Sequence, residues 1–348
     1  MHQNWNWIAL GVEPEDSNPD QVFSAFKYWA LTVKDQGSTF ASSNGVQWDG
    51  PLTMQANTMY KVKITPTPKS ETLPSQLTVQ GRQVNLADAP VTIYENWTWI
   101  AYTPLYTMSV DEALAGVNPE RGDRIKSQTG IAIYGNTGWE GNLKSLESGH
   151  GYMYFSTVKE TKSFVYPTYK LSNPMMNAPR MMSSSRVNDD PTIFTPVDKH
   201  LYPDNMTMVI QLLDGSAVVD TAEVAAFIDG ECRGATRAYN GLYYLIITGE
   251  GSNKPMQIYS CIDGRIVLID DSQFFVSDDN IGDPWAPYVI DLQHLPEAID
   301  GVYADDDADD DAWYTLQGFR LIGYPESPGI YIHNGEKVAI GKKAVEKR

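Results

Sequence analysis

The hexapeptide NWNWIA at residues 4–9 returns as NWTWIA at residues 96–101. An offset of 92 residues therefore aligns Trp5 with Trp97 and Trp7 with Trp99. The same offset pairs Gln36 with Gln128, and after a one-residue gap Trp48 matches Trp139. Tryptophan is a rare residue, so several matched tryptophans in the same order predict that residues 1–170 hold a duplicated module.

Both copies predict strands around a short helix. Alternation puts Trp5, Trp7 and Ala9 on one strand face, and likewise Trp97, Trp99 and Ala101. In copy two, Ser109 with Glu112 forms a capping box, and Gly116 is expected to end the helix. In copy one, Pro19 fits the first helical turn. Short strands are predicted at Ile131–Tyr134 and Tyr152–Phe155, with the GNTG turn at residues 135–138 after the first of them.

The matched tryptophans have two interpretations. Flat rings stack on sugars, whereas large rings also supply most of the buried surface of a small module. Core packing is favoured for Trp5, Trp7, Trp97 and Trp99. Trp48 and Trp139 lie beside turns, so these two are the candidate binding residues.

Residues 191–295 indicate an antiparallel β-sandwich. Apolar runs such as MTMVIQLL and LYYLIIT alternate with turn dipeptides at residues 214–215, 229–230, 240–241 and 263–264. Cys232 and Cys261 fall in these predicted strands, and a disulfide or two buried thiols fit equally well. With only two cysteines the chain is no disulfide-dense scaffold and has no thiolate zinc cluster.

Two polar segments separate the predicted modules. Residues 171–190 are rich in Pro, Ser and Met and predict a linker; a copper site on Met175, Met176, Met181 and Met182 is the weaker alternative. Residues 300–311 contain seven aspartates but lack the spacing of a calcium loop, so an acidic linker over 296–312 is favoured. Residues 313–348 then predict a small C-terminal β unit. The expected organisation is thus copy one (1–90), copy two (91–170), linker (171–190), sandwich (191–295), linker (296–312) and tail (313–348), a mainly β chain.

Composition narrows the classes of function. The net charge of −18 disfavours nucleic acid as a partner, and seven of those charges belong to the aspartate run. The five histidines lie far apart in sequence without HxxxH spacing, so no metal, cofactor or catalytic site is predicted. No apolar run reaches the length of a membrane helix, and the chain begins without a signal-peptide pattern. Either the protein is cytosolic, or this chain is the C-terminal part of a longer one.

The string GDRIKSQTGIAIYGNTGWEGNLKSLESGHGYMYFS at residues 122–156 resembles a module of surface and secreted proteins of Bacteroidota. EVAAFIDGECRGATR at 223–237 is similar to the sandwich that accompanies it, and the end of the chain resembles tails sorted by type IX secretion. The resemblance implies an extracellular or outer-membrane location, with a signal peptide upstream or removed, and contact between the tail and the secretion machinery. Copy one departs from the pattern, with VKDQGSTFASS in place of IKSQTGIAIY and Met59 where copy two has Gly151.

These observations favour a non-catalytic, monomeric C-terminal region that binds a glycan or an extracellular protein and ends in an export tail. The alternative is a purely structural spacer that carries an upstream enzyme or repeat domain. A hydrolase would need paired carboxylates in a cleft, and the abundance of acidic residues alone does not indicate one. Exposed, coplanar aromatic rings would favour binding over the spacer.

Overall fold

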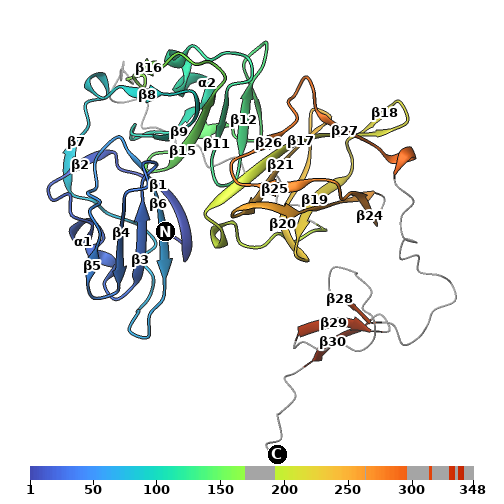
Figure 1. Ribbon diagram of the computed structural model, residues 1–348, viewed down its shortest axis with the longest axis horizontal. Coiled ribbons are helices and arrows are strands. Elements are labelled where there is room, and N and C mark those ends of the chain that lie inside the picture. The colour runs from blue at the N-terminus through green and yellow to red at the C-terminus, as the bar shows by residue number, and fades with distance from the viewer. Residues whose placement is uncertain (169–192, 263, 296–312, 316–328, 334–335, 341–348) are drawn as a thin grey trace, which may run out of the picture.

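Two five-stranded antiparallel sheets with the same strand order form the N-terminal half. The computed structural model (Figure 1) describes residues 1–168, 193–262, 264–295, 313–315, 329–333 and 336–340. The first sheet has the order β1-β6-β3-β4-β5 and consists of β1 (Asn4–Ala9), β3 (Ala30–Lys34), β4 (Phe40–Asn44), β5 (Trp48–Asp49) and β6 (Met59–Thr65).

The sheet of copy two repeats this order strand for strand. It reads β9-β15-β11-β12-β13 from its first strand, with β9 (Asn96–Ala101), β11 (Arg124–Lys126), β12 (Ile131–Tyr134), β13 (Trp139–Gly141) and β15 (Gly151–Ser156). The sequence match places β1 on β9, β3 on β11, β4 on β12 and β6 on β15. The duplication seen in the sequence is therefore a duplication of topology as well.

A short helix follows the first strand of each copy. These are α1 (Pro19–Val22) with η1 (Ser24–Phe26), and α2 (Val110–Ala113) with η3 (Ala115–Val117). Both halves of the capping box of Ser109 and Glu112 are present, and Pro19 occupies the first helical turn, as predicted. The expectation that Gly116 ends the helix is wrong, because α2 stops earlier and continues as the 3₁₀ turn that contains Gly116.

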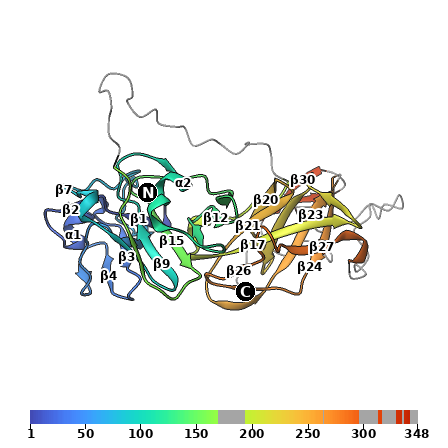
Figure 2. The same ribbon diagram turned by 90° about the horizontal axis from the view of Figure 1, so that it is seen from above.

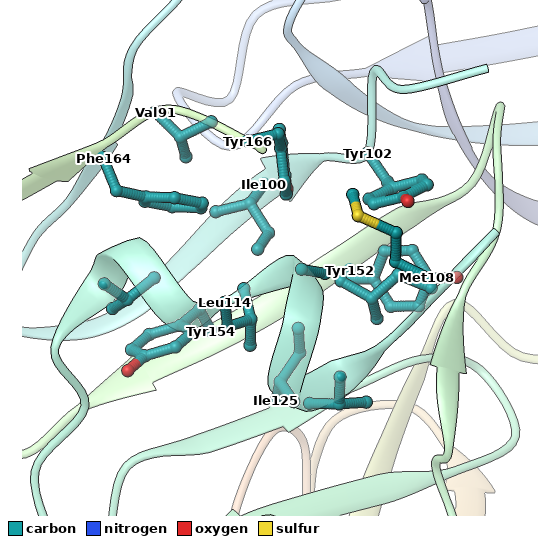
Figure 3. Close-up of a cluster of buried hydrophobic side chains, with 14 of the residues drawn as sticks. Val91, Ile100, Tyr102, Met108, Leu114, Ile125, Tyr152, Tyr154, Phe164 and Tyr166 are labelled. Atoms are coloured by element: carbon teal, nitrogen blue, oxygen red, sulfur yellow. The ribbon is translucent and has the colours of Figure 1, made fainter. Parts of the chain in front are cut away.

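Short paired strands complete the two copies. They are β2 (Val12–Pro14) with β7 (Gly81–Gln83), β8 (Val91–Ile93) with β16 (Lys162–Phe164), and β10 (Met108–Ser109) with β14 (Ser145–Leu146); η2 (Leu86–Asp88) precedes β8. In copy two they close a core of Ile100, Leu114, Tyr152, Tyr154 and Phe164 between the sheet and α2 (Figure 3).

Alternation along β1 and β9 decides which side chains enter these cores. Ile8 and Ile100 belong to the core clusters of their own copies, whereas Trp7 lies in a separate cluster with Met59 and Met153. Trp97 and Trp99 pack against that separate cluster. Because neighbouring residues of a strand point to opposite faces, the tryptophans turn away from the core of their own module. Their packing surface is a neighbouring module instead.

The third module is a larger, curled sheet with the order β18-β17-β21-β20-β19-β23-β24. Its strands are β17 (Asp204–Asp214), β18 (Ala217–Val219), β19 (Glu223–Ile228), β20 (Glu231–Tyr239), β21 (Leu242–Gly249), β23 (Gln257–Ile262) and β24 (Arg265–Asp270). Strands β26 (Asn280–Ile281) and β27 (Tyr288–Asp291) run parallel to β17, and β22 (Ser252–Pro255) pairs with β25 (Phe274–Val276). η4 (Lys199–Leu201) and η5 (Leu292–His294) flank the sheet.

The predicted turns explain two of these hairpins. Asp229, Gly230, Asn240 and Gly241 all have positive φ, the conformation that a two-residue hairpin turn requires. The mainly β, sandwich-like class predicted from the sequence is confirmed. Figure 2 shows the copies beside the sandwich, and both contact it, copy one through Lys61 and copy two through Lys126.

The described part of the tail is a three-stranded antiparallel sheet of β28 (Trp313–Thr315), β29 (Gly329–His333) and β30 (Glu336–Ile340). The rings of Trp313 and His333 stack at 4.2 Å. The predicted linker with Met175, Met176, Met181 and Met182, and the aspartate run at 300–311, lie outside the described residues.

A buried carboxylate organises the interior of copy two. Asp123 is completely buried and accepts hydrogen bonds from the Tyr154 hydroxyl at 2.7 Å, from the backbone and hydroxyl of Thr157, and from the backbone of Glu120. Lys162 adds an ion pair at 3.1 Å. Burial by itself would raise the pKa of Asp123, but these hydrogen bonds outweigh it and the pKa is lowered. At the positions that match Asp123 and Tyr154, copy one has the apolar residues Leu31 and Val62.

We expect Asp123→Asn to lower the free energy of unfolding by about 2–4 kcal/mol at pH 7, since an ion pair and charge-assisted hydrogen bonds are lost together. A carboxyl with a lowered pKa in the folded state stabilises the fold above its unfolded pKa of about 4, and this stabilisation fades as the pH falls below that value. The difference between wild type and variant in urea unfolding should therefore shrink in acid. Glu160→Gln, an exposed change in the same module, is the control. Equal stabilities of wild type and Asp123→Asn at pH 7 would contradict this role.

Candidate functional site: the junction of the three modules

Each copy closes the exposed edge of the other copy with one glutamine. The Gln36 side chain accepts a hydrogen bond from Trp99 N at 2.7 Å and donates to the Trp97 carbonyl at 2.7 Å. The matching Gln128 accepts from Trp7 N at 3.0 Å and donates to the Trp5 carbonyl at 3.1 Å. Edge strands leave backbone groups unpaired, and a carboxamide can satisfy one donor and one acceptor at once. The exchange is reciprocal, so the copies associate with approximate twofold symmetry.

Departures from this symmetry let the two copies fit together. A side chain at Gly151 would collide with the Met59 side chain, since a Cβ there would lie 2.4 Å from Met59 Cγ. Met59 and Gly151 occupy matching positions in the two copies, so the large residue of one copy fills the space left by the small residue of the other. The difference at this position therefore has a packing reason.

Lys61 lies at the centre of the junction and is 1% exposed. Its Nζ lies 4.5 Å from the Trp7 ring and 4.6 Å from the Trp99 ring, and it pairs with Asp204 of the sandwich at 2.7 Å. Burial lowers the pKa of Lys61, and Asp204 opposes that shift. Burial alone would raise the pKa of Asp204, but attraction by Lys61 outweighs it and the pKa is lowered. One ammonium group thus contacts all three modules.

Lys126 makes a comparable contact from copy two and is fully buried; its matching residue in copy one is Lys34. Its Nζ lies 4.5 Å from the Trp97 ring, pairs with Asp278 at 2.8 Å, and donates to the Asn205 carbonyl at 3.0 Å. Burial lowers the pKa of Lys126 to about 8, with Asp278 opposing the shift. The ammonium form therefore persists at neutral pH, held by one aspartate and one carbonyl of the sandwich.

Apolar contacts extend the joint between copy two and the sandwich. Ile131 and Ile133, both completely buried, form a cluster with Val209, Leu242 and Tyr244 of the sandwich. Arg124 pairs with Asp283 at 3.0 Å beside this cluster. In copy one the positions of the two isoleucines hold Phe40 and Ser42. The segment IKSQTGIAIY thus supplies residues of copy two that contact the sandwich. The matching segment of copy one lacks these isoleucines and does not form such an apolar contact with the described part of the sandwich.

A cleft of about 800 Å³ opens where the three modules meet. It is lined by β1, by the turn at Ser127–Thr129, by residues Glu147–Tyr152 and by the η4 region. His2, His150 and His200, which are distant in sequence, all line it, and the rings of His2 and His200 stack at 4.0 Å. Nδ1 of His200 lies 2.6 Å from the Trp5 carbonyl, and burial lowers its pKa. Sequence spacing gave no sign of this gathering.

The two candidate binding tryptophans lie in different sheets and are not brought together. Trp48, at edge strand β5, stacks on Phe23 with the ring centres 5.9 Å apart. Trp139, at edge strand β13, packs edge-on against Tyr134 and Tyr154. Both rings are partly buried against the cores of their own copies. Their geometry provides packing, not a shared platform for a sugar.

The cysteines are both buried thiols. Strand β19 lies between strands β20 and β23, which carry Cys232 and Cys261, so the two residues are on strands that are not neighbours. Cys232 lies opposite Phe227 and Cys261 opposite Glu223 of β19. Two interstrand spacings alone separate the cysteines by about 9–10 Å, and this offset along the strand adds to that, so they are beyond the reach of a disulfide. Burial raises the pKa of Cys232 to about 11, which suits an unreactive core thiol.

Among the described residues no cluster of His, Cys, Asp and Glu has the arrangement to hold a metal ion, and no helix is long and apolar enough to cross a membrane.

No family model, curated protein or solved structure matches the chain.

The two members of the Lys126–Asp278 ion pair should differ in how much stability their loss costs. Asp278→Ala leaves an ammonium group without its carboxylate in a site that water does not reach, and we expect a loss of about 3 kcal/mol in unfolding free energy. Lys126→Met leaves Asp278, which is 28% exposed and can be hydrated, so a loss of about 1 kcal/mol or less is expected. Asp279→Ala, an exposed neighbour, is the matched control for urea unfolding. The reverse order of the two losses would refute this assignment.

Proposed function

We propose that this chain is a non-catalytic segment of a bacterial surface or secreted protein, in which three β modules form a rigid platform for neighbouring domains. The observation that carries the proposal is the joint itself. Lys61 and Lys126 are buried between tryptophan rings of the copies and aspartates of the sandwich. Joints between independently moving domains are usually polar and hydrated, and ion pairs buried this deeply are unusual in them.

The aromatic residues support the platform more than the binding alternative. Trp7, Trp97 and Trp99 contact buried lysines between modules, and Trp48 and Trp139 pack on cores. None of these rings joins another in a coplanar, exposed row of the kind that a glycan would favour. Adhesion is the second candidate, and the cleft lined by three histidines favours it.

The platform can be tested by the distance between two spin labels. Cysteines introduced at the exposed positions Thr53 and Asp271 would report the distance between copy one and the sandwich by pulsed electron paramagnetic resonance. A narrow distribution is expected for the native joint. The double variant Lys61→Met with Lys126→Met should broaden it, whereas Lys69→Met on the surface should leave it unchanged. A broad distribution in the otherwise native chain would refute a rigid platform.

The C-terminal unit is proposed as the export or anchoring signal, with an extracellular or outer-membrane location for the chain. The resemblance of residues 313–348 to type IX tails supports this role, as does their separation from the platform by an acidic segment. Deleting residues 313–348 should abolish export in a bacterium that exports the intact protein, while the remainder still folds. Cell fractionation measures the first result and circular dichroism the second. Undiminished export of the truncated, folded protein would contradict the role.

A further inference from the structure

The two copies present matching faces, which the sandwich covers unequally: on copy one it contacts Trp7 and Lys61 at one end of the face, and on copy two it covers the face as far as β12. In copy two a row of paired residues, Trp97, Phe155, Arg124 and Ile133, crosses strands β9, β15, β11 and β12. The sandwich covers this side of the sheet through Lys126, Arg124 and the two isoleucines. In copy one the matching row crosses β1, β6, β3 and β4, and consists of Trp5, Lys63, Thr32 and Ser42.

The row in copy one is partly exposed. Lys126, Ile131 and Ile133 are completely buried, whereas Lys34 and Ser42 at matching positions are partly exposed and Phe40 is 49% exposed. The uncovered face consists of Trp5, Thr32, Lys34, Phe40, Ser42 and Lys63. The matching face of copy two is buried under the sandwich, so the partly exposed face of copy one is a candidate docking surface.

The charges of the uncovered face indicate which kind of partner it would bind. The ammonium groups of Lys34 and Lys63 lie 5.1 and 5.7 Å from the Trp5 ring. Among the described residues neither lysine has a carboxylate within ion-pair distance. In a chain of net charge −18, two unpaired cations beside an aromatic ring form a local positive surface.

Copy two shows which chemistry such a face accepts. There Lys126, the counterpart of Lys34, takes a carboxylate of the sandwich, and Arg124, the counterpart of Thr32, takes a second one. The partner in both contacts is an acidic polypeptide with apolar side chains beside its aspartates. Copy one has Phe40 and Ser42 at the positions of the two isoleucines, so its face is less apolar. Such a face suits a transient partner better than a permanently bound domain.

We propose that the uncovered face of copy one is a docking site for an acidic polypeptide segment with aromatic or apolar residues beside its carboxylates. Lys34 and Lys63 would pair with carboxylates, and Trp5 and Phe40 would contact the apolar side chains. This site goes beyond the platform function: it uses the part of the copy-one sheet that adjoins the joint between Lys61 and Asp204.

The test uses a fluorescent peptide, DGVYADDDADDDAW, which has the sequence of residues 300–313 and combines seven carboxylates with two aromatic rings. The host is the full chain with its own seven aspartates in 300–311 changed to asparagine, which removes competition within the chain. Fluorescence anisotropy should show binding that weakens as salt is raised. Lys34→Ala with Lys63→Ala should weaken it about tenfold, and Lys69→Ala should not.

Three results would overturn the proposal: no binding, equal binding by the double variant, or equal binding of a peptide with asparagine in place of every aspartate. Polygalacturonate that binds the same face more tightly than the peptide would also overturn it in favour of an anionic polysaccharide. Thr32→Glu is a second variant that places a negative charge in the row, and it should also weaken binding. Unchanged thermal unfolding of each variant shows that the sheet remains folded.

Discussion

The arrangement of the modules depends on two ammonium groups that water does not reach. A buried charge is costly unless it is paired, so Lys61 and Lys126 require Asp204 and Asp278 at close range. The lysines belong to different copies and both aspartates belong to the sandwich, so both requirements are met only when all three modules are together. Trp99 of copy two adds a cation–π contact to Lys61 of copy one, which forms only when the two copies are together. Specific association follows from this penalty on the separated modules.

Duplication with divergence explains the rest of the junction. A symmetric pair of identical copies would place two Met59 side chains, or two glycines, at the matching contact, and would offer the sandwich two equal faces. The chain instead has Met59 opposite Gly151, and isoleucines only in the copy that carries the sandwich. The parts that remained alike are the ones that serve both copies equally, namely the edge tryptophans and the glutamines that cap them. Asymmetry therefore selects one arrangement out of several.

The sequence predicted more of the fold than of the junction. Capping residues, turn dipeptides and alternation act over a few residues, which is why the capping box at Ser109 and the strand Ile131–Tyr134 were correctly predicted. The Gln36–Gln128 match was visible, but its meaning required knowing that each residue lies beside the other copy's edge strand. Lys61 and Lys126 looked like ordinary strand lysines, since burial between modules leaves no local pattern. Trp48 and Trp139 were chosen because they adjoin turns, a criterion blind to Phe23 and Tyr154 packing beside them.

The same reasoning assigns different roles to the acidic and basic residues of the chain. Excess aspartate keeps the surface negative, and against that background a few lysines become the distinctive groups. Lys126 pairs with an aspartate of the sandwich, is buried and joins modules, whereas its counterpart Lys34 in copy one is partly exposed beside Trp5. Since the two situations arise at matching positions of one duplicated sheet, the chemistry of the joined face is the best guide to what the open face can bind. The internal joint thus defines the partner more closely than the overall charge does.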